Sequence, residues 1–537
     1  MEKIAIHSAY GLWPLLEYEL DIAQRELDKG NEVTFYYCQG NQNICEANKY
    51  NANGSIKKRY CVECRSRTLN GLRWLDPGRG KLKYLEYENI SLEQRDQVDG
   101  IISKYCTSDK NEDIIKKNVN IDNVDIYESA ISTLATTIKM SNLKLDKYFK
   151  ELIQYIKSGL ISYFSAINNL SDFNADKIYL YNGRMSRYRP LLRIAQQKKI
   201  EISVYEYPYT GFMNYVLIDG TYPHDIGNVA DLLKIFFDNS DTPLSEKYKT
   251  GESWLSRRVH DSSQVSDVLI PKFTERQVEK KIPNAWREDQ FNVALFISSE
   301  YELGDIDEVK RSMPHSQVET IKVIASCISN IEIYVRIHPY LENVNHEFVN
   351  SIKELGALDG VNIILPESTV DSYYLMELAD LIISFGSTTG IEAAFLSKPV
   401  LTIGCSYYEH FNATATIRTS EDMLRLIKAA KDNDFSGYPD KRQRNLGACL
   451  YAFSFLNFGV KPQYILKDKF YGGCMIRKGA CNHITSRLIF KIMNRVIDIP
   501  SNFLYGIKLV YLDRTKFKKI IKNPYEIICK NFFGDHP

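Results

Sequence analysis

A run of small hydroxyl residues and glycines follows an apolar stretch in the second half of the chain. Residues 381–394 read Leu-Ile-Ile-Ser-Phe-Gly-Ser-Thr-Thr-Gly-Ile-Glu-Ala-Ala. The apolar part predicts a buried strand, and Ser387, Thr388 and Thr389 stand where a helix would begin. Helix N-termini with hydroxyl side chains bind phosphate, although an N-capped turn without a ligand has the same composition. Glu392, inside that helix, could accept hydrogen bonds from ribose hydroxyls.

A histidine stands at the end of another predicted strand. The segment Tyr334-Val-Arg336-Ile-His338-Pro339 should leave the strand at its proline, which places His338 at the carboxyl edge of a sheet. A histidine there can donate a hydrogen bond to a phosphate oxygen, and Arg336 could supply positive charge. A lone His-Pro pair is usually structural. Together with the Ser/Thr turn it predicts one phosphate site at one sheet edge.

Polar residues also follow predicted strands in the first half of the chain. Asn182 and Arg184 come after one strand, Glu206 ends the next, and His224 and Asp225 stand in a later loop. A carboxylate in such a position can act as a general base or as a nucleophile. For Arg184, a surface charge at a helix start is an equally good interpretation.

Strand and helix alternation must position these residues. Apolar and β-branched runs predict strands at 3–8, 32–38, 177–181 and 201–205, and again at 293–297, 331–337, 361–365, 381–384 and 400–403, with helices such as 13–27 between them. Such spacing implies right-handed βαβ crossovers. We therefore predict an α/β protein with two Rossmann-like, doubly wound domains, whose ligands bind at the carboxyl ends of the strands.

The same pattern suggests a division of the chain. We expect an N-terminal acceptor and catalytic domain over 1–240, with a Cys-rich loop and a helical insertion, and a connection over 241–290. A nucleotide-sugar-binding domain should follow over 291–430, and a basic helical extension over 431–537. At 537 residues the chain is long enough for two or three domains.

The His-Pro and Ser/Thr pair resembles motifs of bacterial capsule and surface-polysaccharide glycosyltransferases with the two-Rossmann GT-B architecture. The resemblance covers 291–405. In the cytidine-nucleotide branches of this group, which include sialyltransferases, Kdo transferases and CDP-glycerol polymer synthases, such motifs bind the nucleotide phosphate. It implies that the first loop of the nucleotide-binding domain, Ser298-Ser299-Glu300, lies beside the donor. The same three residues would also suit a Ser N-cap with an acidic first turn.

The N-terminal half is similar to a pattern of capsule-biosynthesis transferases. Asn182-Gly183-Arg184, Glu206 and Pro223-His224-Asp225 match it, whereas Tyr207-Pro208 departs from the Arg-Gly expected after the glutamate. The resemblance implies that Glu206 and Asp225 are catalytic. It also implies that Asn182, Arg184 and His224 bind the donor or the acceptor.

Four cysteines in a loop-rich stretch could bind a metal. Cys38, Cys45, Cys61 and Cys64 end in a Cys-x-x-Cys pair, and four thiolates would satisfy a tetrahedral structural Zn²⁺. A redox Cys-x-x-Cys would be expected to open a helix after a strand. Core thiols are the alternative, since eleven cysteines without a secretory segment at the start suggest the reducing cytoplasm.

The net charge of +1 hides an uneven distribution. Residues 441–537 hold 18 Lys/Arg and 5 Asp/Glu, which leaves 50 and 62 in the rest of the chain. In the segment 484–496, Arg487, Lys491 and Arg495 recur every four residues beside apolar positions, and four lysines follow within 516–522. Such a helix could bind an anionic membrane surface or pack on the protein with its basic side in water. No stretch is apolar enough to span a membrane.

These observations favour a cytoplasmic glycosyltransferase, peripheral at the inner face of the membrane. It would transfer a sugar from a nucleotide donor, such as CMP-Kdo, to a capsular, O-antigen, lipopolysaccharide or other surface glycan or glycolipid. We expect no metal requirement, because no apolar strand ends in a convincing Asp-x-Asp, and no nucleic-acid partner. The alternatives are a CDP-polyol phosphotransferase of the wall-polymer type, a nucleotide-sugar epimerase and a non-catalytic assembly scaffold.

Overall fold

The computed structural model divides the chain into two compact units. It describes residues 1–12, 14–40, 42, 44–47, 58–107, 111–139, 143, 145–206, 214–260, 280–298, 313–338, 341, 346–468, 472–477 and 480–483. Unit 1 comprises 1–130, 149–207 and 461–537, and unit 2 comprises 131–148 and 208–460. Residues 208–240, grouped with the first domain by the sequence pattern, thus belong to unit 2, as do 241–260 of the expected connection.

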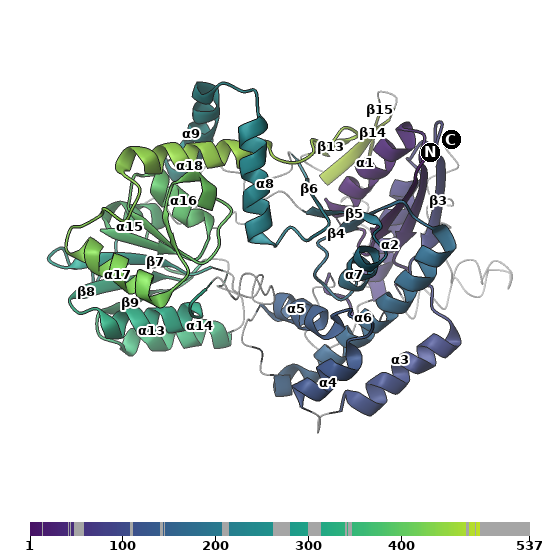
Figure 1. The fold of residues 1–537 in the computed structure, drawn as a ribbon, viewed down its shortest axis with the longest axis horizontal. Helices are drawn as coiled ribbons and strands as arrows, with labels where there is room; N and C mark the ends of the chain where they lie inside the picture. Colours follow the sequence, from purple (N-terminus) through teal and green to yellow (C-terminus); the bar gives the residue numbers. More distant parts are fainter. Residues whose placement is uncertain are drawn as a thin grey trace, which may run out of the picture. The chain divides into compact units, whose positions relative to one another are not determined.

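The first half of the chain forms most of unit 1. Its elements in chain order are β1 (Lys3–Ser8), α1 (Leu15–Asp28), β2 (Glu32–Tyr37), α2 (Lys58–Leu72), β3 (Lys81–Glu86), α3 (Leu92–Tyr105), α4 (Glu112–Val119), α5 (Ile126–Ile138), α6 (Leu145–Phe173), β4 (Lys177–Tyr181), α7 (Arg189–Gln197) and β5 (Glu201–Glu206). The first sheet has the strand order β3-β2-β1-β4-β5-β6, in which the strands from β3 to β5 are parallel and β6 (Val216–Asp219) comes last (Figure 1). The chain reverses its direction of winding between β1 and β4, which makes their carboxyl ends the switch point.

The second sheet lies in unit 2. The elements of this part are α8 (Ile226–Asn239), α9 (Leu244–His260), β7 (Phe291–Phe296), α13 (Gln317–Cys327), β8 (Ile331–Arg336), α14 (His346–Lys353), η4 (Glu354–Ala357), β9 (Val361–Ile364), α15 (Ser372–Leu378), β10 (Leu381–Ser384), α16 (Thr388–Phe395), β11 (Val400–Ile403), η5 (Glu409–Phe411), β12 (Ala415–Ile417), α17 (Ser420–Lys431) and α18 (Lys441–Asn457). The strands are parallel in the order β12-β11-β10-β7-β8-β9. Here the switch point is formed by β7 and β10. Two doubly wound parallel sheets confirm the predicted fold class.

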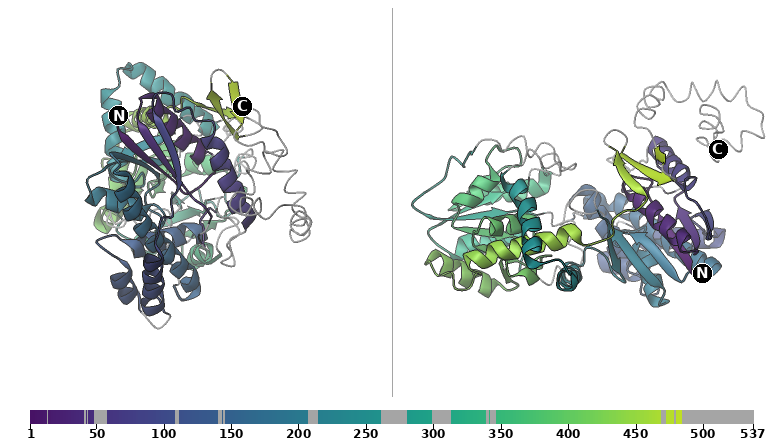
Figure 2. Two further views of the ribbon diagram at one scale, coloured as in Figure 1. Left: turned by 90° about the vertical axis from the view of Figure 1, so that its right-hand side faces the viewer. Right: turned by 90° about the horizontal axis from the view of Figure 1, so that it is seen from above.

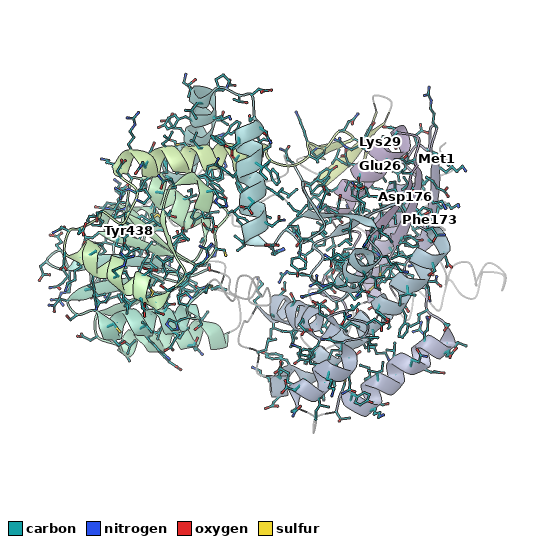
Figure 3. The ribbon with its side chains drawn as sticks, viewed as in Figure 1. Met1, Glu26, Lys29, Phe173, Asp176 and Tyr438 are labelled. Carbon is teal, nitrogen blue, oxygen red and sulfur yellow. The ribbon has the colours of Figure 1, made fainter. Side chains whose placement is uncertain are left out.

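Helices cover both faces of the second sheet, as the views in Figure 2 show. Along β7, Val293 and Leu295 pack with α13, α14 and α17, whereas Ala294 and Phe296 pack with α15, α16 and α18. This alternation explains why the strands are apolar at nearly every position. Tyr438, labelled in Figure 3, belongs to the first of these two layers and donates to the Leu426 carbonyl.

In unit 1, polar contacts join α1 to the sheet it covers. Glu26 accepts from Asn31 Nδ2 at 2.8 Å and from the Tyr179 hydroxyl at 2.9 Å, and it pairs with Lys29 at 2.8 Å (Figure 3). Asp176 accepts from the Lys3 backbone N–H at 2.8 Å. These contacts fix the start of β1 and the end of α1, and with them the path of the chain toward the carboxyl edge.

The C-terminal part begins differently from the predicted basic helical extension. Helix α18 packs against α9 within unit 2. The chain then enters unit 1, where β13 (Ile465–Asp468), β14 (Gly472–Arg477) and β15 (Ala480–His483) form an antiparallel sheet. Asp21 of α1 accepts the backbone N–H groups of Gln463 and Tyr464, each at 2.7 Å.

The predicted amphipathic helix 484–496 and the lysines of 516–522 lie outside the described residues, so membrane binding stays a prediction. In the part of the chain that the structure describes, no helix has the length and apolar character needed to cross a membrane.

Candidate functional site

Three neighbouring strands of unit 2 end at the proposed phosphate site. Strand β7 lies between β8 and β10, and the ladder extends one residue beyond β7, where the Ile297 N–H donates to the Arg336 carbonyl at 3.1 Å. His338 follows β8, Ser298 follows β7, and the turn 386–389 follows β10. The topology therefore brings all three to the carboxyl edge at the switch point, where α/β sheets bind ligands. We call these residues the unit 2 edge.

The turn after β10 has a geometry that only glycine permits at two positions. Gly386 has a φ of +70°, and a Cβ there would lie 2.4 Å from the Cys405 carbonyl oxygen. A Cβ on Gly390 would lie 2.5 Å from the Tyr408 hydroxyl oxygen. That hydroxyl donates to the Ser387 carbonyl at 3.0 Å. The start of α16 is therefore held rigidly against the 405–408 loop.

Hydroxyl groups line the beginning of α16. The Ser387 Oγ caps the helix by accepting from the Thr389 N–H at 3.4 Å, so the structural role expected of an N-cap is present. Ser387, Thr388 and Thr389 are only half-buried, but the Thr389 Oγ1 atom is covered and has no hydrogen-bond partner among the described residues. A buried hydroxyl without a partner costs free energy, so a ligand that accepts its hydrogen bond would be favoured.

His338 is neutral at physiological pH. Burial, with a smaller contribution from the Arg336 charge, lowers its pKa to about 4. A neutral imidazole can still donate one hydrogen bond, and an approaching phosphate would favour its protonated form.

Arg336 itself is engaged within unit 2. Its guanidinium donates to the carbonyls of Leu365 and Ser368 and to the Ser372 Oγ. It is buried, and these contacts tie β8 to the loop before α15. The expected contact of Arg336 with phosphate stays a prediction. Its positive charge contributes to the lowered pKa of His338.

Glu392 is buried in α16 with partners from two other helices. Its Oε1 accepts from Arg258 Nε of α9 at 2.7 Å, and its charge also acts on the Tyr373 hydroxyl of α15. Burial first and the Glu392 charge second hold the pKa of Tyr373 well above its ordinary value. The sequence pattern did not indicate Arg258, because it lies far away in the chain within the expected connection. Ribose binding by Glu392 stays a prediction.

The loop after β7 is described only in part. Ser298 is held at the start of α13, where its Oγ accepts from Gln317 Nε2 at 2.9 Å and its N–H donates to Gln317 Oε1 at 3.0 Å. Ser299 and Glu300 lie outside the described residues.

In unit 1, three of the predicted residues meet at the carboxyl ends of β4 and β5. Asn182 and Gly183 have φ values of 60° and 77°, and these two left-handed residues turn the chain at the end of β4. The Asn182 Nδ2 then donates to Glu206 Oε2 at 2.8 Å, and its Oδ1 accepts from the Arg184 N–H at 3.3 Å. All three polar side chains are buried, with exposures of 2% for Asn182, 2% for Arg184 and 5% for Glu206. We call these three residues the unit 1 edge.

His224 and Asp225 belong to unit 2 rather than to the unit that holds Glu206. Asp225 is the N-cap of α8, because its Oδ1 accepts from the Asn228 N–H at 3.3 Å. The structure therefore does not bring Glu206 and Asp225 together within one unit. The short Pro-His-Asp motif before an apolar helix is itself an N-terminal helix signal.

A carboxyl group that the sequence analysis missed lies beside the switch point of unit 1. Glu19 of α1 is buried and accepts from the Tyr205 hydroxyl. Burial raises its pKa to about 8, while the nearby hydroxyls of Ser8 and Tyr205 act in the opposite direction. Nothing in the apolar period of α1 distinguishes Glu19 from a surface residue, so only the packed structure reveals it.

Three of the four cysteines of the zinc prediction, Cys38, Cys45 and Cys61, lie near a buried arginine, and Cys61 and Cys64 both belong to α2. Arg187, 2% exposed, donates to the Ile44 carbonyl at 2.8 Å and contacts Cys38 Sγ at 3.7 Å. The Cys64 Sγ accepts from the Gly11 N–H at 2.9 Å. Burial raises the pKa of Cys45 to about 12, and it also raises the pKa values of Cys61 and Cys64.

Among the described residues, no group of three or more His, Cys, Asp or Glu side chains is arranged to hold a metal ion. The zinc site stays a prediction without support from the geometry.

Comparisons with known proteins add little beyond the fold. No family model matches the chain, and the search of curated proteins gives no match. Among solved structures, the chain is similar to the beta Kdo 2,4 transferase KpsC of Thermosulfurimonas dismutans, with 17% identity over 60% of this chain and 87% of that one and a TM-score of 0.32. It is also similar to the UDP-GlcNAc 2-epimerase of Neisseria meningitidis, with 12% identity over 84% and 98% of the two chains and a TM-score of 0.28. Likenesses this weak carry no argument about activity.

Proposed function

We propose that the protein is a GT-B glycosyltransferase that binds a nucleotide sugar at the unit 2 edge. The observation that carries this proposal is the start of α16. A half-buried helix N-terminus with a buried, unpartnered Thr389 hydroxyl lies at the same sheet edge as the neutral His338. Helix N-termini stabilise phosphate groups, so this edge suits the phosphates of a nucleotide donor.

The same features suit the departure of a nucleotide. Charge develops on the phosphate as the glycosidic bond to the donor breaks, and fixed N–H dipoles and hydroxyls stabilise that charge without rearranging. His338 would donate a hydrogen bond that strengthens as the leaving phosphate becomes more negative. These groups stabilise the charge on the leaving phosphate, and the proposed reaction uses no divalent ion.

We assign acceptor activation to the unit 1 edge. Glu206 would deprotonate the acceptor hydroxyl as a general base. The Asn182 amide orients the Glu206 carboxylate through its 2.8 Å hydrogen bond. Arg184, next to Asn182 in the chain, would bind an anionic group of the substrate. A cytidine nucleotide and a surface-glycan acceptor are the partners we favour, on the resemblance of the His-Pro and Ser/Thr motifs.

A thermal-shift series with CMP, CDP, UDP and GDP tests the binding step. A ligand that binds only the folded state stabilises it by about 2.7 kcal/mol at one hundred times its Kd. We expect the largest shift with a cytidine nucleotide and its loss in His338→Ala. If none of the four nucleotides shifts the unfolding temperature, the proposal is wrong.

Product analysis then tests the reaction class. A glycosidic bond in the product supports the transferase, whereas a phosphodiester indicates a polyol phosphotransferase. Conversion of a nucleotide sugar in the absence of any acceptor would indicate an epimerase, and nucleotide binding without turnover would indicate a scaffold.

A further inference from the structure

The hydroxyl group of Tyr408 lies at the centre of the contacts that hold the start of α16. It donates to the Ser387 carbonyl at 3.0 Å, and the Ser384 Oγ lies 3.3 Å from it. The side chain is 1% exposed, and its ring packs edge-to-face on Tyr451 with the ring centroids 5.6 Å apart. A buried tyrosine needs a hydrogen-bond partner for its hydroxyl, and here that partner is the N-cap carbonyl of α16.

Gly390 explains how a tyrosine hydroxyl can come so close to a helix. A Cβ at this position would lie 2.5 Å from the Tyr408 hydroxyl oxygen and 2.8 Å from the Ser384 Oγ. The Gly390 N–H donates to the same Ser387 carbonyl at 3.0 Å. The glycine therefore leaves room for a second donor to the N-cap carbonyl, and any side chain in its place would displace the Tyr408 hydroxyl.

The fixed carbonyl determines where the next amide points. A peptide unit is planar and trans, so the Ser387 carbonyl and the Thr388 N–H point in opposite directions. Tyr408 holds the carbonyl on the buried side, and the Thr388 N–H is therefore directed away from the interior of unit 2. This N–H is among the first amides of α16, which have no partner inside the helix and are available to an anion.

The loop that carries Tyr408 also brings a buried hydroxyl to the turn. Ser406 is fully buried, and its Oγ has no hydrogen-bond partner among the described residues. Its Cα lies 3.7 Å from the position that a Cβ on Gly386 would occupy. With the Thr389 hydroxyl, two covered hydroxyl groups of this kind border the turn, and a ligand that accepts their hydrogen bonds would be favoured.

We propose that Tyr408 is a positioning residue, which orients the Thr388 N–H toward the phosphate group of a bound nucleotide. This inference rests on the proposed function, and it adds a residue that acts from the buried side of the turn without touching the ligand. The Tyr408 hydroxyl fixes the N-cap peptide before the ligand binds, so binding does not have to order that peptide. A leaving phosphate benefits in the same way, because fixed dipoles stabilise its developing charge without rearranging.

Titration calorimetry of Tyr408→Phe with CMP, CDP, UDP and GDP tests this inference. The variant keeps the ring but lacks the hydroxyl, and the Ser387 carbonyl retains the Gly390 N–H as a donor. The N-cap peptide should then be less firmly oriented. We expect the Kd of the nucleotide to rise roughly three- to tenfold, as the loss of one hydrogen bond implies.

A comparison with nucleosides separates positioning from a general loss of structure. Cytidine, uridine and guanosine keep the base and the ribose but have no phosphate. Their affinities are measured by displacement of the bound nucleotide, which also detects weak binding. Tyr408→Phe should change these affinities less than about twofold, because the peptide that it releases contacts only the phosphate.

Tyr438→Phe is the matched control. Tyr438 is also a buried tyrosine of unit 2, and its hydroxyl donates to the Leu426 carbonyl at 3.2 Å in the layer on the other face of the sheet (Figure 3). Its replacement removes the same kind of hydrogen bond and should leave the Kd of the nucleotide unchanged. If Tyr408→Phe does not fold, as judged by circular dichroism, Ser384→Ala takes its place, because the Ser384 Oγ donates to the Ser387 carbonyl at 3.4 Å.

The outcomes separate the two proposals. If no nucleotide binds the unaltered protein, the proposed function is wrong, and the inference with it. Nucleotide binding that is unchanged in Tyr408→Phe, or weakened equally for nucleotide and nucleoside, overturns the inference alone. So does an equal loss of nucleotide affinity in Tyr438→Phe. The same criteria apply to Ser384→Ala where it replaces Tyr408→Phe.

Discussion

The two sheet edges have the same topology but treat their polar groups differently. At the unit 1 edge, Asn182, Arg184 and Glu206 are buried, and Glu206 is already hydrogen-bonded inside the protein. At the unit 2 edge, the turn 386–389 is half-buried and one of its hydroxyls has no partner. The hydrogen bond from Asn182 holds the Glu206 carboxylate in a fixed geometry, whereas a buried hydroxyl without a partner favours a ligand that accepts its hydrogen bond. The comparison suggests that unit 2 binds the nucleotide and that unit 1 keeps a carboxylate oriented for chemistry.

The sharpest test of this division changes one residue in each edge. Glu206→Gln should lower the rate of transfer by about 10³-fold and leave the Kd for the nucleotide unchanged, because the amide keeps the shape but cannot accept a proton. His338→Ala should weaken nucleotide binding by at least about tenfold. Steady-state rates and titration calorimetry measure the two effects.

The comparison fails if the two variants behave alike. Weakened nucleotide binding in Glu206→Gln would mean that the carboxylate contacts the donor instead of the acceptor. Undiminished binding in His338→Ala would remove the histidine from the phosphate site.

The next largest effect concerns the rigid turn of unit 2. Gly386→Ala should lower the free energy of unfolding by about 3 kcal/mol, because the new Cβ meets the Cys405 carbonyl and the φ of +70° strains any side chain. Gly220→Ala is the control. Gly220 has a similar φ of +75° with nothing within 4 Å of its Cβ position, and its replacement should cost only about 1 kcal/mol. Urea unfolding measures the free energy of unfolding of both variants. Equal losses of stability would show that the backbone of the turn can shift to make room for the new Cβ.

The edges should also differ in how pH affects them. The pKa of Glu19 in unit 1 is raised to about 8 from 4.5, so the stability it provides is present below about pH 4.5 and is lost as pH rises through 8. Glu19→Gln should therefore make the protein more stable than the unaltered chain at pH 8, by roughly 2 kcal/mol. The pKa of His338 is lowered to about 4, so its contribution is lost as pH falls from 6.5 toward 4.

Urea unfolding at pH 5 and pH 8 measures this difference. Glu19→Gln should have little effect at pH 5, where the carboxyl is protonated in the folded state. Burial also lowers the pKa of His7 in unit 1 to about 4. His7 therefore adds to the loss of stability at low pH, and only the change in stability at high pH reports on Glu19. A Glu19→Gln variant that is less stable at both pH values would show that the carboxyl group is needed for packing.

The sequence predicted the sheets well, because their strands carry a local signal. Every predicted strand, from Lys3–Ser8 to Val400–Ile403, is present within about two residues, as is usual for such boundaries. The strands β3, β6 and β12 of the two large sheets were missed, as were β13, β14 and β15 of the small antiparallel sheet. Strand β3 is an exposed edge strand with the charged sequence Lys-Leu-Lys-Tyr-Leu-Glu, and β12 has only three residues. Neither has the apolar run that identifies a buried strand.

The site was predicted only where it depends on strand ends. Asn182 and Glu206, which were predicted at the ends of successive strands, are hydrogen-bonded because β4 and β5 are neighbours. The Arg258–Glu392 pair joins residues that are 134 positions apart, and Tyr248 of α9 and Asn445 of α18, which are hydrogen-bonded, are 197 positions apart. Such contacts follow from tertiary packing, and the spacing of residues along the sequence does not predict them.

The smallest expected effect decides whether Asp225 belongs to the chemistry or to the fold. As the N-cap of α8, it should contribute about 1 kcal/mol to stability, which Asp225→Ala removes and Asp225→Asn retains, because asparagine caps equally well. Asp440→Ala, which removes the N-cap of α18, is the matched control and should cost a similar amount. If Asp225 only caps, Asp225→Asn keeps full transferase activity. A large loss of activity at unchanged stability would make this carboxylate catalytic and would assign part of the chemistry to unit 2.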